Sequence, residues 1–210
     1  YNDFIRPLEA DSTGIMVPHL MSFKEAKEIV YFTKFHPVGR RPLDGGNADG
    51  KFCLVDPIEY LKQANEERFV VVQIEDPEPL AELEEICALD GIDMIFFGPA
   101  DFTQGLGVPC DFSDERVAQT RKLVAETARK YGKFAGTTGS ADNIGELYDM
   151  GYQFVNITAG YGVSNATAAN GLSIGYNSLK WKGTNISIEG HTHGYWTWNE
   201  NTIKAVKVNN

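Results

Sequence analysis

Cysteine is scarce in this chain of 210 residues, and the few cysteines lie far apart. Cys53, Cys87 and Cys110 have neither the spacing of a zinc site nor the number that a disulfide framework needs. Reduced thiols in a cytoplasmic protein are the simplest interpretation. Apolar runs long enough to cross a bilayer are absent too, and the first residues do not resemble a signal peptide. We therefore expect a cytoplasmic protein without a membrane partner.

Basic residues are outnumbered in the sequence. It has 19 Lys and Arg against 29 Asp and Glu, which gives a net charge of −10. Nucleic acids and anionic membranes are bound mainly through clustered Lys and Arg, so the composition argues against both as partners. An acidic chain is compatible with a cation site built from carboxylates.

Short apolar runs alternate with helical patterns along most of the chain. Ser22 and Glu25 form a capping box that predicts a helix start. Strands are predicted at 14–18, 69–75, 92–97, 133–137 and 154–158, and helices at 22–33, 56–65, 79–89, 114–131 and 141–150. This alternation indicates parallel strands joined by helical crossovers.

Two architectures fit the alternation: an open doubly wound sheet and a (β/α) barrel. No Gly-x-Gly-x-x-Gly follows the first strand, so the dinucleotide-binding fingerprint is missing. Barrel active sites are built from polar residues at the carboxyl ends of strands. Gln73 and Glu75 end one predicted strand, and Asp101 follows the next. Their placement favours a barrel with its active face at these strand ends.

The last thirty or so residues break the pattern. Short polar β segments are predicted at 185–189, 194–198 and 202–208. We place a boundary near Lys180, between a barrel-like domain of residues 1–180 and an atypical β-rich tail of residues 181–210. His191 and His193 share one face of a predicted strand, which suits a transition metal, although two histidines alone favour a structural role.

Glu75 and Asp101 at adjacent strand ends predict a site for Mg²⁺ or Mn²⁺. Taken singly, each acid is more simply interpreted as a solvated side chain near the start of a helix. We interpret Asp76 and Glu78 in this way. The segment Gly98-Pro99-Ala100-Asp101 predicts a tight turn whose amides approach a ligand carboxylate. Metal and amides together would clasp a 2-oxo acid, and the metal would stabilise an enolate formed from it.

Several segments resemble one known family in their order and spacing. They are Gln73-Ile74-Glu75, Asp90-Gly91-Ile92-Asp93, Phe97-Gly98-Pro99-Ala100-Asp101-Phe102 and Leu106-Gly107. The chain resembles the HpcH/HpaI aldolases over about residues 5 to 175. The resemblance implies a class II aldolase on a (β/α)8 TIM barrel, which joins pyruvate to an aldehyde or cleaves the product. It also implies Mg²⁺ or Mn²⁺, with Co²⁺ as an alternative, and a homo-oligomer that is a trimer or hexamer.

The resemblance assigns roles to single residues. Glu75 and Asp101 match the metal ligands, and Gln73 matches a site residue beside metal and substrate. Gly98, Pro99, Ala100 and Asp101 match the substrate-binding segment, in which the amides of Ala100 and Asp101 receive the pyruvate carboxylate. Glu9 matches an acid that works with a catalytic histidine. Thr138 replaces an apolar residue that the family contributes across a subunit interface, so the second-substrate pocket is expected to differ.

The family's substrate-binding arginine, its catalytic histidine and the first two barrel strands would all precede Tyr1. An open barrel would expose main-chain groups and core, so we expect the sequence to be a fragment of a longer barrel. Neither His19 nor His36 matches the catalytic histidine. His19 follows a strand end and could face the site, but the pattern favours a loop histidine. Arg41 matches a family arginine, or is a surface charge in a loop.

Two other functions stay open at this point. A related enzyme would decarboxylate oxaloacetate to an enolate and then form a carbon–carbon bond. A non-catalytic barrel would keep the scaffold, and perhaps the metal, as a binding protein without turnover.

Overall fold

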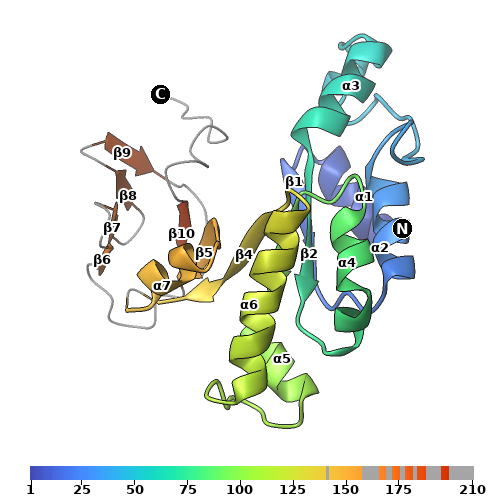
Figure 1. Cartoon of the computed structure of the whole chain (residues 1–210). Coiled ribbons are helices and arrows are strands. Elements are labelled where there is room, and N and C mark those ends of the chain that lie inside the picture. Colours follow the sequence, from blue (N-terminus) through green and yellow to red (C-terminus); the bar gives the residue numbers. More distant parts are fainter. Residues whose placement is uncertain are drawn as a thin grey trace. The chain divides into compact units, whose positions relative to one another are not determined.

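The computed structural model describes residues 1–140 and 142–157, and beyond them the backbone of five short strands. The chain divides into two compact units, Tyr1–Phe134 and Ala135–Asn210 (Figure 1). In the part of the chain that is described, no helix is long and apolar enough to cross a bilayer.

A parallel sheet forms the centre of the first unit. Strand β1 (Gly14–Val17) pairs with β2 (Phe69–Ile74), and β2 pairs with β3 (Met94–Phe97). In the register, Val17 lies opposite Val72 and Ile74 lies opposite Phe97. The carboxyl ends of the three strands therefore meet at one edge, as the sequence predicts.

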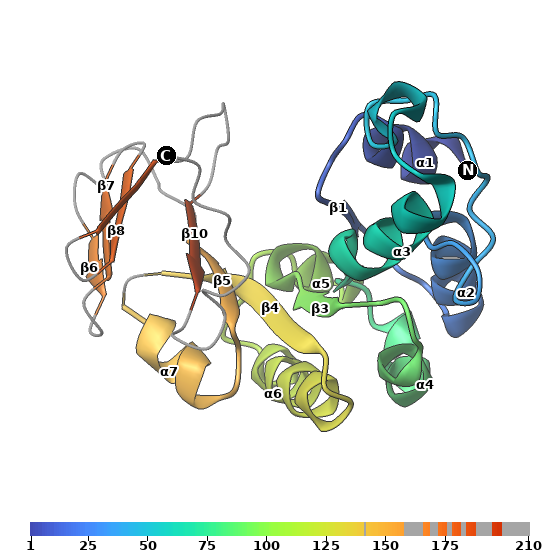
Figure 2. The ribbon, with the colours of Figure 1, turned by 90° about the horizontal axis from the view of Figure 1, so that it is seen from above.

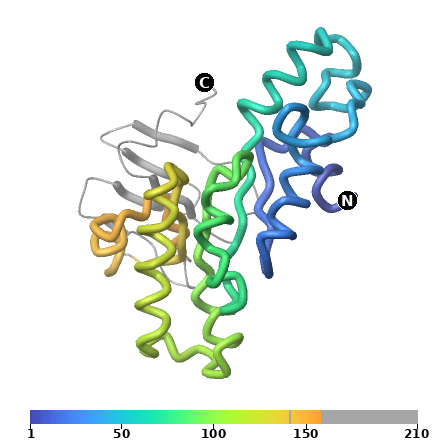
Figure 3. Tube along the Cα trace, turned by 45° about the vertical axis from the view of Figure 1, so that its right-hand side comes forward, coloured from blue at the N-terminus to red at the C-terminus, as the bar shows by residue number. Residues whose placement is uncertain are grey.

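Helices connect these strands. The helices of the first unit are α1 (Asn2–Glu9), α2 (Phe23–Thr33), α3 (Pro57–Glu67), α4 (Leu83–Ala88), α5 (Pro99–Gly105) and α6 (Glu115–Lys130), with the 3-10 turns η1 (Lys51–Cys53) and η2 (Glu78–Glu82). α2, α4 and α6 lie side by side over one face of the sheet (Figures 1 and 2), and α1 packs against α2 (Figure 3). Parallel strands under such a layer form an α/β fold consistent with part of a TIM-like barrel.

The core of the first unit lies between the sheet and this helical layer. Val70, Val72 and Ile74 of β2 are buried, as are Ile29 of α2 and Ile86 of α4. The uninterrupted apolar run of β2 is typical of a strand covered on both faces. Glu75 comes directly after this run, so its side chain lies where little water reaches it.

The predicted Ser22 cap is confirmed at the start of α2, while the return bond from Glu25 goes to the residue before the cap and not to Ser22 itself. The Ser22 hydroxyl accepts the N–H of Glu25 at 3.2 Å, and the Glu25 carboxylate accepts the N–H of Met21 at 2.8 Å. Two predictions at helix starts need correction. The predicted helix 79–89 is divided into η2 and α4 because Glu82, with φ −115° and ψ 14°, leaves helical geometry. The predicted tight turn at Gly98 is the start of α5, with Pro99 at its first position, where proline is favoured.

The second unit also contains a parallel pair. β4 (Phe134–Gly139) begins at the junction of the units and pairs in parallel with β5 (Phe154–Ile157), with α7 (Ile144–Asp149) between them. Helix α7 is shorter than predicted, and Gly151, with φ +105°, follows its end as expected. β10 (Tyr195–Trp198) pairs antiparallel with β5.

A four-stranded antiparallel sheet follows β5 in the sequence. Its strands are β6 (Ala166–Ala168), β7 (Leu172–Gly175), β8 (Ser178–Trp181) and β9 (Thr184–Ser187). β9 and β10 overlap two of the predicted tail segments, whereas β6 to β8 were not predicted. The segment 202–208, His191 and His193 lie outside the described residues. The boundary near Lys180 stays a prediction.

Candidate metal centre

Glu75 is the central acid of the candidate site. It follows the buried strand β2 directly, and its side chain is only 4% exposed. Burial raises the pKa of Glu75 because the carboxylate loses water, while the backbone N–H of His19 acts in the opposite direction. Among the described residues, the ion pairs of Glu75 involve no Lys or Arg, only His19. A buried carboxylate without a strong counter-ion fits a bound cation.

Two hydrogen bonds fix the orientation of the Glu75 carboxylate. The N–H of His19 donates to Oε1 at 2.9 Å, and Nε2 of Gln73 donates to Oε2 at 2.8 Å. The loop after β1 is held beside β2 by a further bond, from the N–H of Leu20 to the Gln73 carbonyl at 3.2 Å. Both oxygens of Glu75 are therefore held from neighbouring strand ends.

Asp101 approaches Glu75 from the first turn of α5. The N–H of Gly98, the residue that caps α5, donates to the Ile74 carbonyl at 3.1 Å and ties the helix start to the end of β2. A Cβ at position 98 would lie 2.4 Å from Oε2 of Glu75. Glycine therefore permits an approach that any other residue would block.

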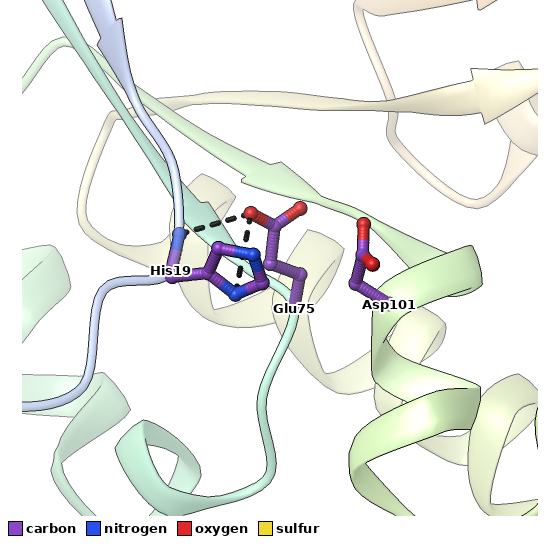
Figure 4. A group of neighbouring side chains, drawn as sticks. All are labelled: His19, Glu75 and Asp101. Atoms are coloured by element: carbon purple, nitrogen blue, oxygen red, sulfur yellow. Dashed lines mark hydrogen bonds and ion pairs between the residues drawn. The ribbon is translucent and has the colours of Figure 1, made fainter.

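The site gathers three side chains from three segments (Figure 4). His19, Glu75 and Asp101 each offer one ligand atom, and these atoms lie within 4.8 Å of one another. The predicted pair of acids is thus brought together, at the carboxyl edge of the sheet. Two carboxylates and an imidazole are a donor set that divalent metals accept.

His19 lies in the loop after β1, as the sequence favours. That loop places it beside the two acids, which the sequence left open as the alternative. Its Nδ1 is 2.8 Å from Oδ2 of Asp76, an acid that we expected only to be solvated near a helix start. The hydrogen bond to Asp76 raises the pKa of His19, and the charges of Glu75 and Asp101 act in the same direction. The position after a strand end was the available signal in the sequence.

The substrate-binding segment has a geometry that suits its predicted role. Pro99 is buried, while Ala100 and Asp101 are exposed in the first turn of α5. The N–H groups of a first helical turn have no acceptor within the helix, so those of Ala100 and Asp101 suit a ligand carboxylate.

Glu9 and Arg41 are not members of this cluster, and Thr138 belongs to the other unit. Glu9 ends α1, ahead of β1, and its carboxylate accepts Nη1 of Arg6 at 2.7 Å. Thr138 lies on β4, in the part of β4 that belongs to the second unit. Arg41 is not a surface charge: it is buried in an ion pair with Asp49, which also accepts the hydroxyl of Tyr60.

Comparisons with known proteins identify the family of this chain. The profile of the HpcH/HpaI aldolase/citrate lyase family matches residues 2–166. A hydroxypyruvate/pyruvate aldolase of Delftia acidovorans is 30% identical over 71% of this chain and 56% of its own length. A 2-keto-3-deoxy-L-rhamnonate aldolase of Klebsiella pneumoniae is 32% identical over 61% of this chain and 48% of its own.

Solved structures give the same result. An HpcH/HpaI aldolase from Desulfitobacterium hafniense is 25% identical, with a TM-score of 0.67 over 75% of this chain and 61% of that protein. The citrate synthase SbnG is 28% identical, with a TM-score of 0.63 over 71% of this chain and 57% of that protein. The chain spans about half the length of the curated relatives it matches. The profile match and these relatives place the chain in the HpcH/HpaI aldolase/citrate lyase family.

Proposed function

We propose that this chain carries the metal-holding part of a class II aldolase, a lyase that makes or breaks a carbon–carbon bond between a pyruvate-like 2-oxo acid and an aldehyde. One observation carries the proposal: the buried Glu75 carboxylate is held through both oxygens beside Asp101. The substrate class follows from the relatives, since the names of hydroxypyruvate/pyruvate aldolase and 2-keto-3-deoxy-L-rhamnonate aldolase share a 2-oxo acid.

Glu75 and Asp101 would hold the divalent cation, with Mg²⁺ or Mn²⁺ as the expected metal and Co²⁺ as an alternative. When bound, the cation would supply Lewis-acid stabilisation of the negative charge that develops on the keto oxygen. Gln73 keeps the Glu75 carboxylate in one orientation through its hydrogen bond to Oε2. A ligand carboxylate set in advance loses less entropy when the cation binds, which favours affinity.

The start of α5 would position the substrate. The N–H groups of Ala100 and Asp101 would receive the carboxylate of the 2-oxo acid and place its keto oxygen toward Glu75. Pro99 has no N–H and fixes its own φ, so it presents the next two amides in helical geometry. Preorganised amide donors of this kind stabilise charge without having to reorganise during the reaction.

Two further roles rest on the resemblance alone. Glu9 would work with a catalytic histidine in proton transfer, and Thr138 would border the second substrate. The same resemblance suggests a homo-oligomer, a trimer or hexamer, and the few cysteines suggest a cytoplasmic protein.

A calorimetric titration of Mn²⁺ into the metal-free chain tests the proposal, with and without pyruvate. We expect pyruvate to tighten Mn²⁺ binding by about tenfold, a usual degree of coupling between two ligands. The Glu75→Ala/Asp101→Ala variant should lose this binding. Glu126→Ala, which removes an exposed carboxylate of α6, should bind like the unaltered chain.

The proposal is contradicted if the double variant binds Mn²⁺ as tightly as the unaltered chain does, or if the unaltered chain binds no Mn²⁺. Circular dichroism of each variant shows whether it is folded. Exchange of the pyruvate methyl protons with deuterated water, followed by NMR, separates the two functional classes. Metal-dependent exchange supports an enolate-forming enzyme, whereas binding without exchange favours the non-catalytic alternative.

A further inference from the structure

We propose that His19 is a third protein ligand of this metal through its Nε2 atom, and that Asp76 orients the imidazole ring for that role. The inference rests on the proposed metal site and deepens it. It turns a pair of oxygen ligands into a site with one nitrogen and two oxygen ligands, which changes the metals that the site should prefer.

The position of His19 is built into the fold. Its N–H donates to Oε1 of Glu75 at 2.9 Å. Its backbone has a φ of +49°, in the left-handed region that residues other than glycine rarely adopt. In Figure 4 the imidazole lies beside the Glu75 carboxylate, and Asp101 lies on the other side of Glu75. One ring nitrogen of His19 and one carboxylate oxygen each of Glu75 and Asp101 fall within 4.8 Å of one another. Two ligands on opposite sides of a cation lie about 4.2 Å apart, so a small adjustment of the side chains would let one cation contact all three.

The ring orientation is the second, independent observation. Nδ1 of His19 is 2.8 Å from Oδ2 of Asp76, so a proton on Nδ1 would be donated to that carboxylate. In metal sites, a ligating imidazole commonly donates its other N–H to a carboxylate, which fixes the tautomer and leaves a lone pair for the metal. With Nδ1 facing Asp76, Nε2 of His19 is the nitrogen left to ligate.

Packing does not account for this arrangement. The His19 side chain is 54% exposed, so polar contacts rather than burial hold it against the two acids. A histidine that serves only as an ion-pair partner of Asp76 would also form the 2.8 Å contact. The two roles differ in one measurable respect, because only a ligand changes the affinity and the selectivity of the site for metals.

Metal preference follows from the donor set. Mg²⁺ takes oxygen ligands and keeps much of its water, whereas imidazole suits ions such as Co²⁺ and Zn²⁺. A site of Glu75 and Asp101 alone offers only oxygen ligands, which suit Mg²⁺. Addition of His19 should raise the affinity for Co²⁺ and leave the affinity for Mg²⁺ nearly unchanged.

The test compares Co²⁺ and Mg²⁺ affinities of the metal-free full chain by calorimetry. His19→Ala should weaken Co²⁺ binding by about 100-fold, at least as much as the loss of an orienting partner does, and should weaken Mg²⁺ binding far less. Asp76→Asn should weaken Co²⁺ binding by roughly 10- to 100-fold, the usual cost of losing an orienting partner. His36→Ala, which removes an exposed histidine elsewhere in the first unit, should change neither affinity.

A direct readout is pulsed electron paramagnetic resonance of the Mn²⁺-loaded chain. The unaltered protein should show ¹⁴N modulation from a bound imidazole, and His19→Ala should not. His19→Asn tolerates the left-handed backbone and guards against misfolding, and it too should lose the signal. If both His19 variants keep the unaltered Co²⁺ affinity and ¹⁴N signal, His19 is not a ligand. In that case the Glu75→Ala/Asp101→Ala variant still decides the proposed function separately.

Discussion

Gly98 allows the start of α5 to lie close to Glu75. Because a Cβ there would lie 2.4 Å from Oε2 of Glu75, Gly98→Ala should displace the carboxylate and break its bond to Gln73. We expect Mn²⁺ affinity to fall by about tenfold or more, the loss that a disturbed orienting contact produces. Calorimetry of the folded variant measures this change.

Gly145→Ala is the matched control for this glycine. Gly145 lies within α7, and nothing lies within 4 Å of a Cβ placed there. Alanine favours a helix by about 0.8–1 kcal/mol over glycine, so this variant should keep its Mn²⁺ affinity and melt slightly higher. Unchanged Mn²⁺ affinity in Gly98→Ala would mean that Glu75 has room to move, and that the close approach does not matter for binding.

At the scale of an element, Asp114 stabilises the start of α6. Its Oδ1 accepts the N–H of Arg116 at 2.9 Å, and its side chain also accepts from the Arg116 guanidinium. These bonds lower the pKa of Asp114 to about 2, from an ordinary value of 3.8. A depressed pKa in the folded state contributes stability above pH 3.8, and this stability is lost as the pH falls toward 2.

Asp114→Ala should therefore lower the melting temperature at pH 7, with a gap to the unaltered chain that narrows between about pH 4 and pH 2. Thermal denaturation followed by circular dichroism across this range measures the gap. Glu126→Ala, on the same helix but away from its start, should change the melting temperature only slightly, and this change should not narrow between about pH 4 and pH 2. A gap for Asp114→Ala that stays constant down to pH 2 would contradict the role of its charge.

For the whole molecule, the candidate site costs stability when no metal is present. Burial raises the pKa of Glu75 above its ordinary 4.5. A raised pKa contributes stability below the ordinary value, and this stability is lost as the pH rises through the folded value. At neutral pH the ionised Glu75 therefore opposes folding of the metal-free chain.

Glu75→Gln should raise the melting temperature of the metal-free chain at pH 7, by roughly 2–4 °C if the cost is about 1 kcal/mol. The gain should shrink as the pH is lowered to about 4, because that pH lies below the raised pKa of Glu75 and the side chain is then protonated in the folded chain. Saturating Mn²⁺ should stabilise the unaltered chain and leave the variant unchanged. Calorimetric melting at both pH values, with Glu126→Gln as the control, measures these shifts. If Glu75→Gln melts at a lower temperature than the unaltered metal-free chain at pH 7, the ionised Glu75 does not oppose folding.

Local patterns in the sequence determined much of this protein. The apolar run before Glu75, the caps at Ser22 and Asp114 and the alternation of strands with helices depend on neighbouring residues. The pairing of Glu75 with Asp101 was predictable because parallel strands bring their carboxyl ends to one edge. The family motifs lie in the same segments.

Only the tertiary structure decided where His19 lies and what its ring contacts. His19 is 56 residues from Glu75 in the sequence, and their contact requires the parallel register of β1 with β2. The sequence likewise allows Arg41 to be a surface charge, because its burial with Asp49 and Tyr60 depends on how a loop folds onto α3. Such contacts join distant segments, so no local pattern encodes them, and the donor set of the site follows from the packing of strand ends.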